Sequence, residues 1–413
     1  MKLPVEISKL RIRTFVTGFA VMLFIGISLA WSLFVAPLEE YFGWTRANTS
    51  IIFTISILSL AFGGIAASLL VRKGFRFRFI FILSCLLSGS GFFLSTRVTH
   101  IAQLAVVYGV FCGFSAGMSY TSIISIIPLW FPEKSAIATG FLLTGYALSG
   151  SVIGPVVALL MNRFGWRAAF FFLGTASFFV LLAGAFFLFP PDSKQVQLLP
   201  HKKIISDARN QSADTPTGQM VKEPAFWVFM VMATFLSSCG MTVINHISPI
   251  FTESLDADIL FATIMVSVIS IVNGISRFCF GFILERIGPY KTIRLIGTLY
   301  LIALVTMFSA LLLRNQWLFI PGACSAILGY GGYSTASPGY VRLIYGEKYF
   351  TQNFAIFNFF AALPPFIGPT LIGGIRTSTN SYIPGFALLV GYSVIGFTLS
   401  CILKTVKNKQ MSK

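Results

Sequence analysis

The stretch Gly281-Phe-Ile-Leu-Glu-Arg-Ile-Gly-Pro289 shows the plan of the chain, because a charged pair and a Gly-Pro pair separate two long apolar runs here. A similar interruption, Val71-Arg-Lys-Gly74, stands 214 residues before Glu285-Arg-Ile-Gly288. Two more pairs of motifs share this offset: Pro132-Glu-Lys134 with Gly346-Glu-Lys348, and Gly154-Pro155 with Gly368-Pro369. Three matches at one offset predict two halves that arose by duplication.

The composition places most of the chain in a membrane. Of the 413 residues, 56% are hydrophobic and only 10% are charged, and a soluble protein of this size cannot hide so much apolar surface. The apolar residues form continuous stretches of about 20, long enough to cross a hydrocarbon core of about 30 Å as helices rather than as barrel strands. We predict twelve spans, at 14–36, 48–71, 77–96, 101–127, 137–161, 167–189, 224–248, 260–284, 291–313, 317–341, 353–375 and 381–403.

A polar segment divides these spans into two sets of six. Residues 190–223 form the longest polar stretch in the chain, as expected for a linker between two bundles. We therefore predict an all-α polytopic fold with an N-terminal six-helix bundle at 1–189, a cytoplasmic linker at 190–223 and a C-terminal six-helix bundle at 224–413. Parallel repeats of this kind are related by an axis along the membrane normal.

The placement of positive charge predicts the topology. A net charge of +17 alone would suit nucleic acid, but 23 of the 30 Lys and Arg fall on one side of the predicted spans and six on the other. By the positive-inside rule, both termini are cytoplasmic in the inner (plasma) membrane, and the basic residues serve topology and anionic lipid rather than nucleic acid. The basic start resembles a signal peptide, but its apolar run is too long and more spans follow, so we expect a retained first helix.

The interrupting motifs carry a family resemblance. The segments 281–289 and 72–74 resemble the loop signature of the major facilitator superfamily, found between helices two and three and again between eight and nine. Val71 departs from it, because an Asp is usual at that position. The resemblance implies the major facilitator fold and a conformational role for these loops, and the Gly-Pro pairs are helix-weakening sites that serve either as bends or in close packing. The candidate gating residues are Arg72, Gly74, Glu285, Arg286, Gly288, Gly154, Pro155, Gly368 and Pro369.

More narrowly, the chain resembles the oxalate/formate antiporter and monocarboxylate transporter group. The motifs are AWSLF at 30–34, WFPEK at 130–134, ATG at 138–140, GWR at 165–167, NxxxR at 273–277 and GEKYFTQNF at 346–354. This resemblance covers nearly the whole chain apart from the linker, and it implies a small organic anion as substrate, bound by an arginine in helix eight. The segment 145–155 faintly resembles a signature of drug/proton antiporters, which keeps an exporter open as an alternative.

One positive charge is left inside the membrane. Arg277 lies in the middle of the span predicted at 260–284, where a guanidinium costs about 2.5–3.5 kcal/mol. All 13 acidic residues fall in predicted loops or at helix ends. A planar guanidinium can give a carboxylate two parallel hydrogen bonds, so we predict that the substrate is the missing anion. Helix carbonyls or water are the alternative partners.

Two neighbouring features narrow the substrate. Asn273 lies one turn before Arg277 on the same face, where proton-coupled monocarboxylate transporters typically have an Asp, so the resemblance argues against proton symport through this pair. Oxalate/formate antiporters also carry a Lys in helix eleven, and the corresponding stretch 356–363 has none. One cation facing a dianion leaves a charge unpaired. We therefore predict a monocarboxylate, such as a short 2-oxo or 2-hydroxy acid.

Polar and aromatic residues in other spans are further candidates for substrate contact. Tyr330 and Tyr333 share a helix face, although packing explains them equally well. A lone histidine such as His246 is more often a structural residue, but it is also the remaining candidate for proton coupling. The full set is Tyr330, Tyr333, Tyr120, Asn245, His246, Asn358 and Trp31. The other tryptophans lie near span ends and predict an interfacial belt: Trp44, Trp130, Trp166, Trp227 and Trp317.

Motifs that power or catalyse reactions in other membrane proteins do not occur in the sequence. There is no GxxxxGK[ST] loop for ATP and no HExxH pair for a metal, so we predict no enzyme, cofactor or metal. A duplicated chain with a polar linker favours rocking halves over a channel. We predict a secondary transporter that works as a monomer by alternating access and favours anion exchange over uniport. Proton-coupled symport and drug or metabolite export are the alternatives.

Overall fold

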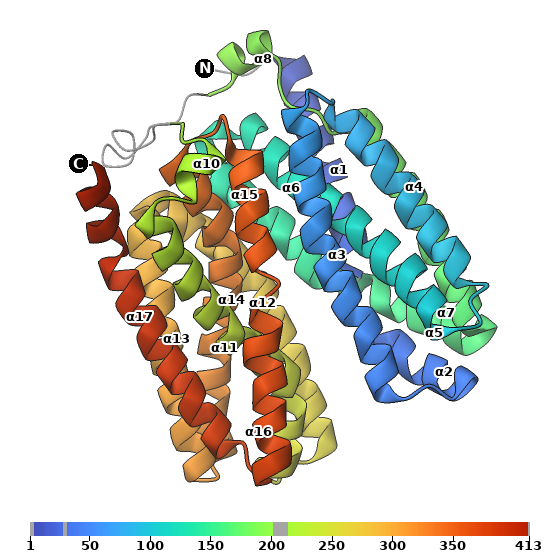
Figure 1. Cartoon of the computed structure of the whole chain (residues 1–413), viewed down its shortest axis with the longest axis vertical. Coiled ribbons are helices and arrows are strands. Elements are labelled where there is room, and N and C mark those ends of the chain that lie inside the picture. Colours follow the sequence, from blue (N-terminus) through green and yellow to red (C-terminus); the bar gives the residue numbers. More distant parts are fainter. Residues whose placement is uncertain (1–3, 28–30, 201–213, 412–413) are drawn as a thin grey trace. The chain divides into compact units, whose positions relative to one another are not determined.

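The computed structural model describes residues 4–27, 31–200 and 214–411, and the regular structure within them is helical (Figure 1). Contacts between residues divide the chain into two compact units. Unit 1 comprises Met1–Lys203 together with Phe354–Phe359, and unit 2 comprises Ile204–Asn353 together with Phe360–Lys413.

The helices of unit 1 are long apolar runs that end at charged or glycine-containing turns. Helix α3 ends at Arg72, and Gly74 then takes a φ of +86°, a left-handed conformation that glycine adopts without strain. The helical segments of this part of the chain are α1 (Val5–Ile25), α2 (Ser32–Phe42), α3 (Arg46–Arg72), α4 (Phe77–Ser95), α5 (Ile101–Leu104), the π-helix η2 (Ala105–Cys112), α6 (Gly113–Trp130), the 3-10 turn η3 (Pro132–Lys134), α7 (Ser135–Phe187) and α8 (Ser193–Leu198).

The helices of unit 2 begin at clear start signals. The side chain of Asp258 accepts from the amide of Leu260 at 3.0 Å at the start of α12, and Pro289 opens α13 directly after Gly288, whose φ is +79°. The helical segments in this part of the chain are α10 (Thr217–Met220), α11 (Pro224–Ser254), α12 (Ile259–Ile287), α13 (Pro289–Leu312), α14 (Gln316–Tyr345), α15 (Phe350–Phe360, of which Phe354–Phe359 belong to unit 1), the π-helix η4 (Phe366–Thr370), α16 (Leu371–Thr379) and α17 (Ile383–Met411). Helices α13 and α14 pack together, and α17 packs on both α11 and α13.

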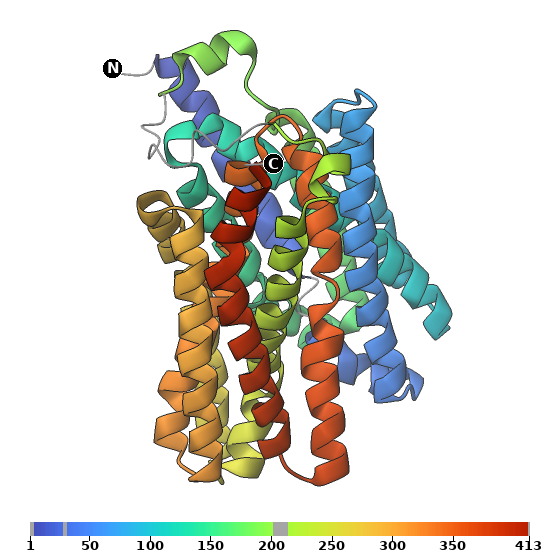
Figure 2. The same cartoon turned by 60° about the vertical axis from the view of Figure 1, so that its left-hand side comes forward.

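Two predicted spans need correction. The span predicted at 14–36 is covered by two helices, because α1 ends at Ile25 and α2 begins at Ser32. Helix α1 itself starts earlier, at Val5, and includes Arg11, which pairs with Glu133 and lies over the Phe131 ring at 4.4 Å. The span predicted at 353–375 is broken, as the orange ribbon between α15 and α16 shows in Figure 2. The physical reason is the Pro364-Pro365 pair, which lacks amide donors and disfavours a helical turn before it.

Eight of the helical segments in the described ranges are long and apolar enough to cross a membrane by length and composition. One of them, Pro132–Phe187, contains both predicted spans 137–161 and 167–189, separated by a non-helical Gly165 with φ 79° and ψ 170°. Helix α14 is not among the eight, in keeping with its many Gly, Ser and Tyr residues. The number twelve therefore stays a prediction.

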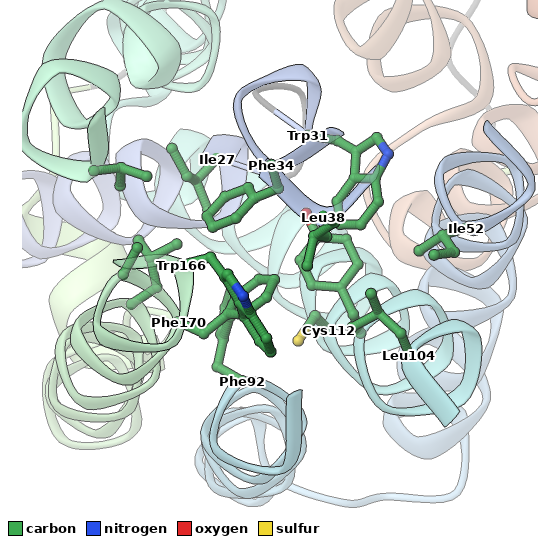
Figure 3. Close-up of a cluster of buried hydrophobic side chains, with 14 of the residues drawn as sticks. Ile27, Trp31, Phe34, Leu38, Ile52, Phe92, Leu104, Cys112, Trp166 and Phe170 are labelled. Atoms are coloured by element: carbon green, nitrogen blue, oxygen red, sulfur yellow. The ribbon is translucent and has the colours of Figure 1, made fainter. Parts of the chain in front are cut away.

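Unit 1 is built around an aromatic core (Figure 3). Trp31 and Phe34 pack there with Phe170, whose ring stacks on Phe34 at a centroid distance of 4.5 Å. The prediction of an interfacial belt is wrong for two tryptophans: Trp166 is buried in this core, and Trp130 is fully buried with its indole N–H donating to a backbone carbonyl at 2.7 Å. Both lie near helix ends but face inward.

The end of the predicted linker is bound to unit 2. Asp214 Oδ1 accepts from the amides of Glu347 and Lys348 at 3.0 and 3.1 Å, and Thr217 donates to Asn353 at 2.7 Å. These bonds tie the chain entering α11 to the turn between α14 and α15. The middle of the linker, 201–213, lies outside the described residues.

Candidate functional site

Arg277 lies inside unit 2 on α12 and is only 5% exposed. Its Nε donates to Asn273 Oδ1 at 3.3 Å, across one turn of the helix. This bond uses one of the five N–H donors of the guanidinium and fixes the plane of the group. The next acid along the helix, Glu285, is eight residues further on, a rise of about 12 Å. The Arg277 side chain is therefore a buried cation oriented by a neutral amide.

Small residues hold this turn of α12 against α14. A Cβ at Gly331 would overlap the Oγ of Ser276 and come within 2.8 Å of the Asn273 carbonyl oxygen. Ser276 donates to that same carbonyl at 2.9 Å, and Thr335 donates to the backbone carbonyl of Arg277 at 2.9 Å. Only glycine permits so close an approach, so the position of Arg277 depends on α14.

The two tyrosines predicted from α14 lie at the same level. The charge of Arg277 acts on the phenol of Tyr330. The phenol of Tyr333 interacts with the hydroxyls of Ser237 on α11 and Ser337 on α14. Tyrosine hydroxyls are good donors to carboxylates. The structure thus gathers a buried cation and polar groups from α11, α12 and α14 in one region of unit 2.

His246 and Asn245 belong to a second polar group, nine residues and about 13 Å beyond Ser237 along α11. The Nε2 of His246 lies 3.0 Å from the Pro369 carbonyl oxygen, and its Nδ1 lies 3.3 Å from the hydroxyl of Tyr382. Because a carbonyl only accepts, a neutral His246 carries its proton on Nε2 and accepts from Tyr382. Asn245 is exposed and bonds back to its own helix. A structural tie between α11 and η4 accounts for His246 here.

Three other candidates lie in the region clustered as unit 1. Tyr120 on α6 is half-buried, with its ring 5.4 Å from that of Tyr146 on α7. Trp31 is buried in the aromatic core, and its indole N–H donates to the Thr49 carbonyl at 3.1 Å. Asn358 on α15 has a buried Nδ2 without a hydrogen-bond partner among the described residues, a donor that suits an anion. A substrate contact by any of them stays a prediction.

The candidate gating residues divide between turns and packed positions. Gly74 and Gly288, which are 214 residues apart, both have positive φ, and Arg72 and Arg286 beside them are exposed. A Cβ at Gly368 would come within 2.5 Å of a backbone oxygen of α11, so close packing accounts for that glycine. The pair Gly154-Pro155 lies inside α7, and the non-helical residue of α7 is Gly165 instead. Their roles in gating stay predictions.

Sequence reasoning missed the hydroxyl groups around Arg277. Ser237, Ser276 and Thr335 each lie in an apolar helix, where isolated hydroxyls usually bond back to the preceding turn. Thr335 instead bonds across to the Arg277 carbonyl on α12, whereas Ser276 bonds back within α12. The one available signal was the run of small and polar residues from Gly329 to Ser337, which marks a helix face that allows close approach.

Comparison with known proteins identifies the family. Residues 16–369 match the family described as Major Facilitator Superfamily. The chain is 25% identical to an oxalate:formate antiporter of Oxalobacter formigenes, over 91% of this chain and 87% of the relative. It is 23% identical to monocarboxylate transporter 12 of Mus musculus, over 92% and 83%. It is 24% identical to an uncharacterized MFS-type transporter, YhjX, of Escherichia coli K12, over 84% and 82%.

Solved structures agree on the fold. The proton:xylose symporter XylE superposes with a TM-score of 0.71 at 13% identity, covering 96% of each chain. The transporter FucP superposes with a TM-score of 0.65 at 11% identity, covering 94% of this chain and 98% of that one. The resemblance to the oxalate/formate and monocarboxylate group is confirmed, and this chain belongs to the Major Facilitator Superfamily of multi-pass membrane transporters.

Proposed function

We propose that this transporter moves small organic anions, monocarboxylates in particular, by alternating access, with Arg277 as the counter-charge of the substrate. The observation that carries the proposal is Arg277 itself, 5% exposed in the middle of α12 and oriented by Asn273. Charged residues inside the membrane face the interior of a bundle and mark substrate pathways. Two of the relatives are named for carboxylate transport, which supports the same substrate class.

The surrounding groups suit a carboxylate. A guanidinium binds both oxygens of a carboxylate with parallel N–H bonds, and phenols add further donors. Tyr330 lies within the field of Arg277, and Tyr333 lies one turn further on α14. A cationic or neutral drug would gain nothing from this charge, so export of such compounds is disfavoured.

The single cation favours a monoanion. The stretch 356–363 on and after α15 contains no Lys or Arg. A dicarboxylate bound at Arg277 would keep one charge without a counter-ion in a medium of low dielectric constant, and burying such a charge is costly. A short 2-oxo or 2-hydroxy acid carries one negative charge and one polar group for the tyrosines.

Exchange is the mode that this charge favours. A loaded carrier moves with the substrate anion beside Arg277, whereas an empty carrier moves without it. If the two barriers differ by about 3 kcal/mol, loaded exchange outpaces empty return by roughly a hundredfold. Anion exchange is therefore proposed over uniport.

Two measurements test the proposal. Purified protein is first screened by thermal shift against small mono- and dicarboxylates, because a ligand that binds only the folded state raises its apparent stability. The best ligand is then used for uptake into proteoliposomes with and without the same anion inside. We expect preloading to accelerate uptake strongly in the native chain and not in Arg277→Gln. Equal uptake by both proteins contradicts the role of Arg277.

Proton-coupled symport is the second candidate, and His246 is the observation that favours it. Protonation at Nδ1 would turn an acceptor for Tyr382 into a donor, which couples the charge of His246 to the contact between α11 and the residue before α17. If an imposed pH gradient alone drives accumulation and preloading has no effect, symport replaces exchange. Loss of that accumulation in His246→Gln would then assign the proton to this residue.

A further inference from the structure

Tyr300, in the middle of α13, is fully buried, and its hydroxyl has no hydrogen-bond partner among the described residues. Buried hydroxyls almost always find a partner, and an unpaired one calls for an explanation. Phenylalanine would fill the same space without burying a polar atom. The hydroxyl is therefore the feature of Tyr300 that packing does not explain.

The backbone makes room for this phenol from two sides. A Cβ at Gly240 on α11 would lie 2.5 Å from the Tyr300 hydroxyl, and a Cβ at Gly329 on α14 would lie 3.0 Å from its ring. The same point at Gly240 is 2.6 Å from Cδ2 and 2.7 Å from Cβ of Tyr330. The hydroxyl of Tyr300 and the edge of Tyr330 therefore converge on one glycine.

Tyr330 continues this line toward the candidate site. Tyr330 directly precedes Gly331, which packs on Asn273 and Ser276 in the turn that carries Arg277, and the phenol of Tyr330 is within the field of Arg277. Three other tyrosines with buried hydroxyls, Tyr290, Tyr340 and Tyr345, belong to a separate group around Glu223. Among these four tyrosines, Tyr300 is the one whose hydroxyl lies beside Tyr330, at Gly240.

We propose that Tyr300 is a positioning residue for the substrate anion: its hydroxyl donates, directly or through one water, to the Tyr330 hydroxyl, which in turn donates to the carboxylate at Arg277. Hydrogen bonds in such a chain strengthen one another. The Tyr330 hydroxyl becomes a better acceptor when it donates to the carboxylate, so the bond from Tyr300 is stronger in the loaded than in the empty carrier. The inference rests on the proposed function. It adds helix α13 to the site formed by α11, α12 and α14.

The test is a double-mutant cycle with Tyr300→Phe and Tyr330→Phe. The dissociation constant of the best monocarboxylate is measured by calorimetry, and the KM and maximal rate by exchange in proteoliposomes. We expect Tyr300→Phe to weaken binding about fivefold in the native background and to have no further effect in Tyr330→Phe. The melting temperature without ligand should be unchanged or higher, because an unpaired buried hydroxyl is removed. Tyr290→Phe, which removes a buried hydroxyl from the group around Glu223, is the control and should bind as the native chain does.

Several outcomes overturn the inference. Native affinity in Tyr300→Phe does so, and so does an equal loss in the native and Tyr330→Phe backgrounds, which would indicate a packing effect. If Tyr300→Phe lowers the melting temperature, the double-mutant cycle still tests the inference, because only a hydrogen bond through Tyr330 predicts that Tyr300→Phe has no further effect on affinity in the Tyr330→Phe background. If no monocarboxylate binds the native chain at all, the proposed function fails and this inference fails with it. Binding that is lost in Arg277→Gln but native in Tyr300→Phe removes only the role of Tyr300.

Discussion

The Nε of Arg277 donates to the amide oxygen of Asn273 at 3.3 Å, one turn earlier on the same helix. An amide orients the guanidinium without neutralising it, whereas a carboxylate in its place would do both. Asn273 therefore adds no negative charge that would compete with an incoming anion. The proposals of a monocarboxylate substrate and of anion exchange both depend on this pair of residues.

Replacing Arg277 with Gln should lower anion affinity by at least about thirtyfold, because truncating one partner of a buried charge pair costs about 2–5 kcal/mol. Arg277→Lys should bind with intermediate affinity, since it keeps the charge but not the planar fork. The bond from Thr335 goes to the backbone carbonyl of residue 277 and survives both changes, so the fold should persist. Calorimetry and the melting temperature measure the two effects. Arg294 is exposed, so Arg294→Gln is the control and should keep native affinity. Native affinity in Arg277→Gln would refute the role of the charge.

Replacing Asn273 with Asp should weaken anion binding more than tenfold near neutral pH. The new carboxylate forms an ion pair with Arg277 and competes with the substrate. As the pH falls through the pKa of that carboxyl, protonation removes the competitor and affinity should return. Asn273→Ala should lose only about fivefold and show no new pH dependence. Affinity measured across a pH series distinguishes the two, and a pH-independent Asn273→Asp would contradict the proposed geometry.

Substrate charge is tested by competition. Labelled monocarboxylate is displaced by formate, by short 2-oxo and 2-hydroxy acids, and by oxalate and longer dicarboxylates. We expect the monocarboxylates to compete better, because 356–363 supplies no second cation. Tighter binding of oxalate than of every monocarboxylate tested would count decisively against the prediction. Introducing a lysine at Asn358 should shift the preference toward dicarboxylates if α15 contributes to the site.

The topology is tested by labelling. The six native cysteines are first replaced, and single cysteines are then placed at Lys203 in the linker and at Asp256, which lies in the turn between α11 and α12. An impermeant reagent should label the two positions from opposite sides of the membrane, with Lys203 on the cytoplasmic side. Labelling of both from the same side would overturn the predicted orientation.

Gly331→Ala should destabilise the fold by about 1–3 kcal/mol, because the new methyl group overlaps the Oγ of Ser276 and moves α12 away from α14. Anion affinity should fall with it, since Arg277 is on the displaced turn. Removing the obstructing hydroxyl in Ser276→Ala should restore part of both losses in the double variant. Gly374→Ala is the matched control, because a Cβ there meets nothing within 4 Å. Thermal unfolding without ligand measures the change, and a neutral Gly331→Ala would show that the helices do not require this approach.

The sequence alone determined the features that depend on composition and helical period. Continuous apolar runs indicate membrane helices, and Arg277 inside one of them marks a site whatever packs around it. The four-residue spacing of Asn273 and Arg277 places them on one face, because a helix turns once in 3.6 residues. The family resemblance also rested on motifs within the chain, and the match over residues 16–369 confirms it.

The tertiary structure decided which of these faces meet. His246 and Tyr333 look alike in the sequence as polar residues in apolar helices, yet His246 is tied to Pro369 and Tyr382. Tyr333 instead lies between Gly331, which packs on Ser276, and Thr335, which bonds to the Arg277 carbonyl. Trp31 reads as a candidate contact and is a core residue in the structure. Tyr300 carried no signal at all, because its significance depends on glycines from two other helices. Helical period specifies direction around one axis, whereas contact between helices depends on side-chain volumes on both partners, and only packing brings those together.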